Sequence, residues 1–207
     1  MKWILIIMTI VLPAFRHPGA SIMTWAVDKE TSVKILGASN VNSFTFASRG
    51  YEEKDTLIVY QTAKTKKVTF LKGLLRLPVK NFKNGNPMLT RDFKKMLEAQ
   101  QHPYILMNLK SLTTMADQPS KNQPVEAEIE ITISGKSKTR QVCLLATRSG
   151  DMVYFHGKER INFSDFDLQP PTKVLGFINV KNELQIEFNL ALKVLRHIDQ
   201  SNLILNE

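Results

Sequence analysis

Strict alternation of apolar and polar residues near the C-terminal end of the chain most constrains its fold. The apolar residues at every second position are Leu184, Ile186, Phe188, Leu190 and Leu192. Because successive side chains of a strand point to opposite faces, this period of two predicts a strand with one buried face. The same period recurs in short runs between residues 33 and 79, at 105–109 and at 125–133. Many antiparallel strands are therefore predicted, which leaves a β-sandwich or a closed barrel as the main architectures.

One segment has the period of a helix. Phe93, Met96 and Leu97 lie at positions i, i+3 and i+4, and Thr90 precedes them as a candidate N-cap. The pattern predicts a helix from Arg91 to about Gln100 that follows a turn at residues 84–87. Without long helices between the strands, a doubly wound nucleotide-binding fold is not expected. Further along, Ile161 and Phe163 are predicted to begin an extended segment.

An apolar run near the N-terminus predicts export. It extends from Trp3 to Phe15 after a lysine, and the small residues Gly19 and Ala20 follow it. The run is shorter than the roughly 20 residues that span a bilayer, which favours a secretory signal peptide over a retained anchor. We therefore expect residues 1–20 to be a signal peptide and the mature chain to be periplasmic or secreted.

The composition favours one globular domain. The chain has 207 residues, of which 43% are hydrophobic, more than a disordered chain would carry. Its one cysteine, Cys143, excludes an intramolecular disulfide and a cysteine-based zinc site. The neighbours of Cys143 are apolar, so we expect its side chain to be buried.

Motifs for catalysis, metals and phosphate binding are absent from the sequence. His102, His156 and His197 do not share a ligand spacing, and neither a nucleophile elbow nor a glycine-rich phosphate loop is present. Asp165 and Asp167 lie two positions apart, but exposure beside a loop is the preferred interpretation of this pair. We therefore predict no catalytic residue, no metal ligand and no cofactor.

The net charge of +9 does not indicate nucleic-acid binding. The cations cluster at residues 64–67, 72–83 and 136–140, mainly at predicted turns and on outer strand faces. Nucleic-acid binding would require aromatic residues between the cations, and only Phe82 has such a place. Solvated faces are the preferred interpretation, and attraction to anionic lipid head groups is the functional alternative.

Several short motifs, taken in order, resemble the YceI-like lipid/polyisoprenoid-binding family in the divergent form frequent in Bacteroidetes. The matching segments are Trp25 with Asp28, Gly37 to Phe44, Met88 to Phe93, His102 to Ile105, Ile131 to Lys138, and Ile161 to Phe166 followed by Pro170 and Pro171. The likeness covers residues 24–194 as one domain and leaves 195–207 as a C-terminal tail. Thr31 and Asp167 depart from the family pattern, where a histidine and a glycine are common.

The resemblance implies a fold and a function. The fold would be an all-β, lipocalin-like extended antiparallel barrel of eight strands, with one short capping helix. The chain would be an exported, non-enzymatic protein that sequesters or carries a polyisoprenoid or other lipid in the barrel interior. Seven apolar side chains are expected to line that interior: Phe44, Phe46, Phe70, Phe93, Phe163, Ile186 and Phe188.

Two alternatives remain open from the residues alone. One is a structural or stress-related envelope protein whose packed barrel holds no ligand. The other is an enzyme that acts on a lipid, for which His156, Asp165 and Asp167 are the candidates. The sequence predicts no oligomeric state.

Overall fold

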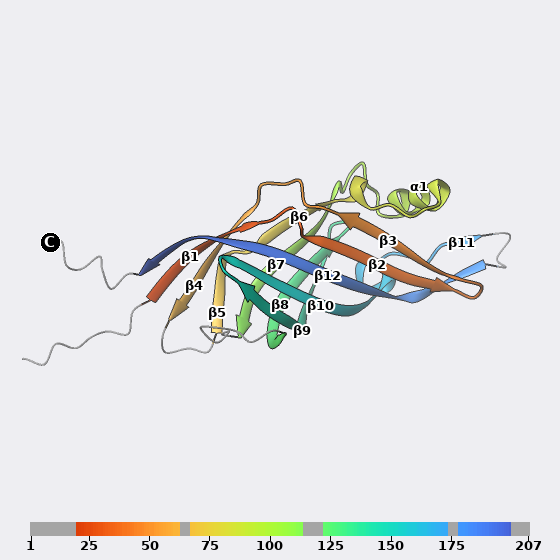
Figure 1. Ribbon diagram of the computed structural model, residues 1–207. Coiled ribbons are helices and arrows are strands. Elements are labelled where there is room, and N and C mark those ends of the chain that lie inside the picture. The colour runs from red at the N-terminus through yellow and green to blue at the C-terminus, as the bar shows by residue number, and fades with distance from the viewer. Residues whose placement is uncertain (1–19, 63–66, 114–121, 174–177, 200–207) are drawn as a thin grey trace, which may run out of the picture.

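The computed structural model describes residues 20–62, 67–113, 122–173 and 178–199 as a ring of antiparallel strands with one α-helix (Figure 1). Nearly all of the expected signal peptide lies outside these residues, as do residues 200–207 of the expected tail. Ala20, the last residue assigned to the signal peptide, begins the first strand.

Eight strands close the ring through hydrogen-bonded ladders. Their order is β1, β4, β5, β7, β8, β9, β10 and β12, and β12 pairs back onto β1. This closure confirms the predicted eight-stranded antiparallel barrel. The bounds are β1 Ala20–Val27, β4 Thr56–Thr62, β5 Lys67–Lys72, β7 Tyr104–Thr113, β8 Gln123–Ile133, β9 Lys136–Ser149, β10 Met152–Asn162 and β12 Ile178–Asp199.

Strand β12 is 22 residues long and serves two partners along one of its edges. Its second half pairs with β1, and its first half pairs with β2, Ser32–Ser39. Beyond β2 lies β3, Ser43–Arg49, and the two-residue strand β11, Thr172–Lys173, also pairs with β12. The wall of the barrel next to β12 is therefore formed by β1 at one end and by β2 and β3 at the other.

Strand β7 divides its edge in the same way. It pairs with β5 near one end and with β6, Leu74–Pro78, near the other. Gly73 separates these two strands, and its carbonyl accepts the Leu109 N–H at 2.9 Å. A Cβ atom at Gly73 would lie 1.9 Å from the Leu109 carbonyl oxygen, so this close approach requires glycine.

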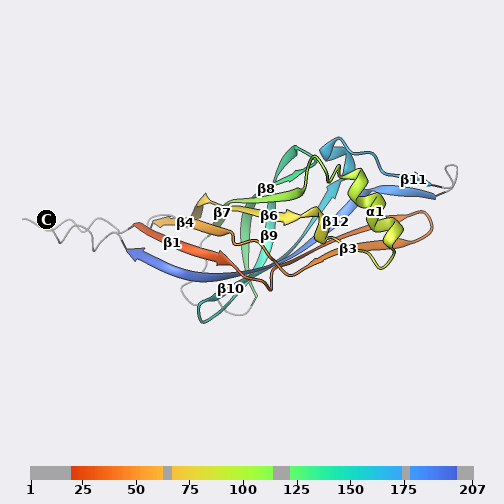
Figure 2. The ribbon, with the colours of Figure 1, turned by 90° about the horizontal axis from the view of Figure 1, so that it is seen from above.

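At the β6 end, no ladder among the described residues joins β3 to β6. The 3₁₀ helix η1, Val79–Asn81, follows β6, and Lys83 then forms an isolated bridge with Ala47 of β3. The helix α1, Pro87–Met96, comes next. Figure 2 shows α1 at the same end of the barrel as β2, β3 and β11.

The helix begins four residues earlier than predicted and ends earlier too, at Met96 rather than about Gln100. The N-cap is Asn86, whose side-chain oxygen accepts the Met88 and Leu89 N–H groups at 2.8 and 3.3 Å. Pro87 occupies the first helical position, which suits a residue without an N–H group. Thr90 instead accepts the Asn84 N–H at 3.0 Å, and so supports the turn before the helix.

Most predicted inward positions are buried, although Phe44 is only partly buried, and the alternating apolar residues of β12 are all at most 6% exposed. The prediction for Cys143 is wrong: its side chain is exposed, because Val142, Leu144 and Ala146 occupy the inward positions of β9. The extended segment predicted from Ile161 is also wrong. Strand β10 ends at Asn162, and Phe163 begins a second 3₁₀ helix, η2, Phe163–Phe166.

The end strands are longer than the sequence indicated. Strand β1 starts before the domain start assigned at residue 24, and β12 continues to Asp199, past the tail start assigned at residue 195. The two extensions pair with each other, from Ser21 opposite Asp199 onward. Backbone ladders therefore extend past the bounds that the sequence indicated.

A buried carboxylate, Asp55, attaches the segment that connects β3 with β4 to strand β6. Asp55 is 8% exposed and receives hydrogen bonds from Arg76 Nη2 at 2.6 Å, from the Arg76 backbone N–H at 3.1 Å and from the Tyr51 hydroxyl. Burial acts to raise the pKa of Asp55, but the bonds from Arg76 and Tyr51 hold it below its ordinary value. Burial and the bond to Asp55 raise the pKa of Tyr51 well above its usual range.

The close approach at Gly73 predicts a large cost for any side chain there. Gly73→Ala should lower the free energy of unfolding by at least about 3 kcal/mol, since the contact is with backbone. Gly85→Ala is the control, because a Cβ atom there meets nothing within 4 Å, and it should change stability by less than about 0.5 kcal/mol. Urea unfolding measures both, and equal stability of the two variants would contradict the argument.

The depressed pKa of Asp55 predicts a pH-dependent stability. Its stabilising contribution is fully present above the ordinary carboxyl value of 3.8 and is lost as the pH falls through the lower folded-state pKa. At neutral pH, Asp55→Asn should cost about 1.5–3 kcal/mol, and the difference from wild type should shrink in acid. Glu52→Gln, at an exposed position, is the control. A difference that stays constant down to strongly acidic pH would refute the assignment.

Candidate functional site

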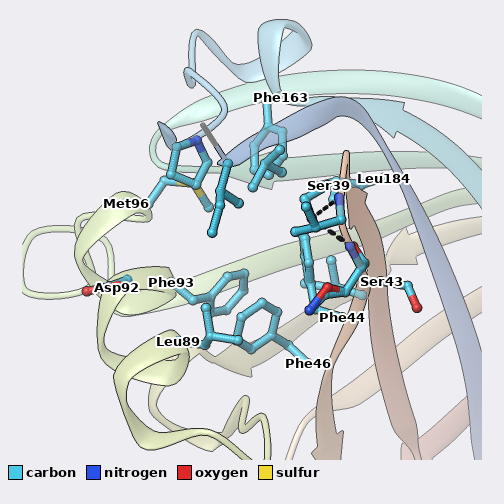
Figure 3. Close-up of a pocket in the computed structure, with 16 residues that line it drawn as sticks. Ser39, Ser43, Phe44, Phe46, Leu89, Asp92, Phe93, Met96, Phe163 and Leu184 are labelled. Carbon is cyan, nitrogen blue, oxygen red and sulfur yellow. Dashed lines mark hydrogen bonds between the residues drawn. The ribbon is translucent and has the colours of Figure 1, made fainter. Parts of the chain in front are cut away.

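An apolar cavity lies between α1 and the barrel end formed by β2, β3 and β12. Its volume is about 210 Å³, and it opens to the surface (Figure 3). Most of its lining is apolar. The apolar members are Ile35, Val41, Phe44, Phe46, Leu89, Phe93, Met96, Phe163, Pro171, Ile178, Val180 and Leu184.

Aromatic rings form one wall of this cavity. Figure 3 shows Phe93 of α1 lying against Phe46 of β3, and their ring centroids are 4.1 Å apart with the rings nearly parallel. Phe44 meets Phe46 edge to face at 5.7 Å, and Phe82 lies 6.1 Å behind Phe93. The contacts of Phe93 with Phe46 and Phe82 hold α1 against the barrel.

Polar groups at the cavity are few and lie mainly at its rim. They belong to Ser39, Asn42, Ser43 and Asp92. The Ser39 hydroxyl donates to the Asn42 carbonyl at 3.0 Å and accepts the Val41 and Asn42 N–H groups at 3.2 and 3.0 Å. This serine therefore shapes the turn between β2 and β3.

The rest of the described barrel interior is more densely filled. Two further voids measure about 20 Å³ each, which is on the scale of one or two water molecules. In the half closed by β1, Trp25 meets Phe70 edge to face at 5.9 Å and stacks on Phe155 at 6.3 Å. The open space is thus concentrated at the α1 end.

The seven side chains predicted to line the interior fall into three places. Phe44, Phe46, Phe93 and Phe163 all line the 210 Å³ cavity. Ile186 and Phe188 line one of the 20 Å³ voids. Phe70 is 7% exposed and packs on Trp25, away from both.

Sequence reasoning missed several lining residues. Leu89 lies one helical turn before Phe93, so a helix that starts at Pro87 would have placed both on one face. Ile178 and Val180 belong to the β12 segment beside β2, and Leu184 was assigned to a buried face without a cavity role. Their position at the cavity depends on how strands pair, which one sequence does not specify.

Asp165, one of the two neighbouring acids in the sequence, forms an ion pair at the barrel wall. Strand β9 pairs with β10 only from Leu144 to Ser149, and η2 lies beside the unpaired part. There Arg140 Nη2 contacts Asp165 at 2.8 Å and Arg140 Nε lies 3.8 Å from Glu159. Burial raises the pKa of Glu159, against the opposing effect of Arg140.

The second acid, Asp167, forms an exposed ion pair. Lys136 Nζ contacts its carboxylate at 2.8 Å and holds the pKa of Asp167 below its ordinary value. Neither Asp165 nor Asp167 lines the cavity. The enzyme interpretation therefore finds no support from this pair.

His156, the third candidate for lipid chemistry, points to the outer face of β10. Its Nδ1 lies 2.6 Å from the Asn189 side-chain oxygen, in a surface hollow. Within the described ranges, no three His, Cys, Asp or Glu side chains gather as a metal site. No helix in those ranges has the length and apolar character needed to cross a membrane.

Comparison with known families identifies the chain. The model of the YceI-like domain matches residues 25–192. The chain belongs to the YceI-like domain family. This membership confirms the resemblance seen in the short motifs, over nearly the same range of residues.

Solved structures support the same fold for this YceI-like chain. A polyisoprenoid binding domain from Saccharophagus degradans, implicated in plant cell wall breakdown, aligns with a TM-score of 0.59 at 10% identity, and the match covers 83% of this chain and 98% of that one. BcnA of Burkholderia cenocepacia aligns with a TM-score of 0.54 at 18% identity, over 78% and 95% of the two chains. A comparison with curated protein sequences found no match.

The structural role of Arg140 and Asp165 can be tested by a double-mutant cycle. Arg140→Gln and Asp165→Asn should each lower the free energy of unfolding by about 1–2 kcal/mol, and the double variant should lose less than the sum by at least about 0.5 kcal/mol. Lys138→Gln, at an exposed neighbouring position, should be nearly neutral. Strictly additive losses would show that the two side chains do not stabilise the wall together.

Proposed function

We propose that this YceI-like chain is a binding protein that holds a hydrophobic or amphiphilic ligand, a polyisoprenoid or other lipid, in the cavity beneath α1. One observation carries the proposal: the cavity opens to the surface, and its lining is almost entirely apolar. The fold relation to a polyisoprenoid binding domain supports the same ligand class.

Apolar burial supplies the affinity in this proposal. Each square ångström of apolar surface removed from water contributes about 25 cal/mol, so a hydrocarbon chain against Phe44, Leu89 and Val180 would bind without precisely placed polar groups. The polar rim near Ser43 and Asp92 would face the head group of an amphiphile. Such a site needs no catalytic residue, which favours a binding protein over an enzyme.

The ligand in this proposal sits at the α1 end. The Trp25, Phe70 and Phe155 rings occupy the opposite half, which favours a ligand that enters and leaves beside the helix. We also propose that the protein is exported and meets its ligand at an anionic membrane surface. The apolar run at residues 3–15 and the net charge of +9 support these two parts.

Native purification tests the proposal directly. The protein should carry a lipid that mass spectrometry detects in an organic extract, and delipidated protein should bind an added long-chain isoprenoid alcohol. The absence of both a bound lipid and binding of added isoprenoids would overturn the proposal. That result would favour a structural or stress-related envelope protein with a packed barrel.

Charged substitutions in the cavity should weaken this binding. Leu89→Glu and Val180→Glu each place a carboxylate against the ligand and should lower affinity for the isoprenoid alcohol at least about tenfold. Leu71→Glu is the matched control, because Leu71 is 62% exposed on β5 and does not line the cavity. Its affinity should equal that of wild type. Equal affinity of all three variants would place the ligand elsewhere.

A further inference from the structure

The outer face of α1 is strongly basic. Between residues 80 and 95, five cations accompany a single acid: Lys80, Lys83, Arg91, Lys94 and Lys95 against Asp92. Met88, Arg91 and Lys95 follow one another at helical spacing on the exposed side of α1, opposite Phe93. We define the helix-end surface as Met88, Arg91 and Lys95 together with Lys83, Lys94 and the turn residue Val41.

Several lysines on the barrel strands are paired with carboxylates, whereas within the described ranges the lysines of this surface are not. Lys110, Lys136, Lys158 and Lys193 each lie within ion-pair distance of a carboxylate. In the part of the chain that the structure describes, none of Lys83, Lys94 and Lys95 has such a carboxylate partner. Their positive charge is therefore available to an anion outside the protein.

The cations also surround a depression that an anionic group can enter. Lys83, Arg91 and Lys94 line a surface hollow of about 470 Å³ together with Asn84, Pro87 and Thr90. Arg91 lies at the limit of ion-pair distance from Asp92, 4.0 Å, and its side chain is 76% exposed. The hollow is thus an exposed basic site on the side of α1 away from the cavity.

Two exposed apolar side chains accompany these cations. Met88, in the first turn of α1, is 58% exposed, and Val41, in the turn between β2 and β3, is 63% exposed. Val41 also lines the cavity, and Met88 is adjacent to the lining residue Leu89. Apolar side chains with cations around them are the composition that binds the interface of an anionic bilayer.

We propose that the helix-end surface docks on an anionic lipid bilayer and places α1, the helix that covers the cavity, at the head groups. Lys83, Arg91 and Lys94 contact the lipid phosphates, while Met88 and Val41 enter the interface. This inference rests on the proposed function, because it brings the helix over the ligand cavity to a membrane that holds apolar ligands. An acidic protein partner would use the charges but has no need for the exposed apolar side chains beside them.

Vesicle cosedimentation tests the docking. Wild-type protein should bind vesicles of equal parts phosphatidylglycerol and phosphatidylcholine, bind vesicles of phosphatidylcholine alone at least about tenfold more weakly, and lose binding as salt is raised. Equal binding to both kinds of vesicle, or to neither, would overturn the proposal.

A charge-matched pair of variants locates the contact. Arg91→Glu with Lys94→Glu should weaken binding to the anionic vesicles at least about tenfold. Lys29→Glu with Arg148→Glu makes the same change in net charge away from α1, and it should retain most of the binding. Equal losses in the two double variants would show a general charge effect and overturn the assignment to this surface.

The apolar contact is tested separately. Met88→Ser with Val41→Ser should weaken vesicle binding several-fold without changing the net charge, and thermal unfolding confirms that each variant is folded. Unchanged vesicle binding would overturn the insertion of these side chains and favour a purely electrostatic partner.

Isoprenoid binding, measured on Arg91→Glu with Lys94→Glu, separates the two proposals. Retained isoprenoid binding with lost vesicle binding supports docking by this surface. Vesicle binding that depends on this surface in a protein without any isoprenoid affinity would instead support docking and overturn the proposed function.

Discussion

The backbone of Ala191 lies where β12 changes its pairing partner from β2 to β1. The barrel depends on hydrogen bonds to the Ala191 backbone groups, which belong to neither ladder. On one side of Ala191 β12 pairs with β1, and on the other with β2. The Thr31 hydroxyl accepts the Ala191 N–H at 3.0 Å and donates to its carbonyl at 3.2 Å, and the Asp28 N–H also donates to that carbonyl at 2.8 Å. Since Thr31 is 1% exposed, these bonds replace the ladder where water is excluded. The departure of Thr31 from the family pattern thus has a structural role in this chain.

The cavity follows from this change of partner. On the N-terminal side of Ala191, β12 pairs with β2, and β2 pairs with β3. On the other side of the ring, the edge of β7 pairs with β5 before Gly73 and with β6 after it. The two new edge strands, β3 and β6, are not joined by a described ladder, so this end of the barrel is covered by a helix instead. A helix packs through side chains rather than a hydrogen-bonded ladder, and the space beneath Leu89, Phe93 and Met96 remains open.

The sequence predicted which side chains point inward but not how closely they approach one another. Phe46, Phe93 and Phe70 all follow the correct period, and all three are buried. Two of them border the cavity and the third packs on Trp25, because their neighbours come from other strands whose register depends on the whole sheet. Strand β1 escaped prediction for a related reason: of residues 21–27, only Trp25 and Val27 are buried, and the strand pairs with β4 and β12.

Two local predictions, the burial of Cys143 and the start of the helix, were wrong because each depends on the path of the backbone. A run of apolar residues predicts burial of all its members, but a strand with one buried face can bury only every second one, so Cys143 and Leu145 face outward. At the helix, both Asn86 and Thr90 are good caps, and only the actual path of the turn decides which side chain reaches the free N–H groups.

The net charge alone does not show where the unpaired cations lie. A net charge of +9 fits scattered surface lysines, and many lysines do pair with carboxylates on the strands. On α1 the helical period separates two chemistries on one short element: Leu89 and Phe93 face the cavity, while Met88 and Arg91 face outward. The element that covers the apolar cavity also carries Lys94 and Lys95, which have no carboxylate partner among the described residues. Residues of this one ten-residue helix line both the cavity and the basic hollow, so a change in the position of α1 would alter the two sites together.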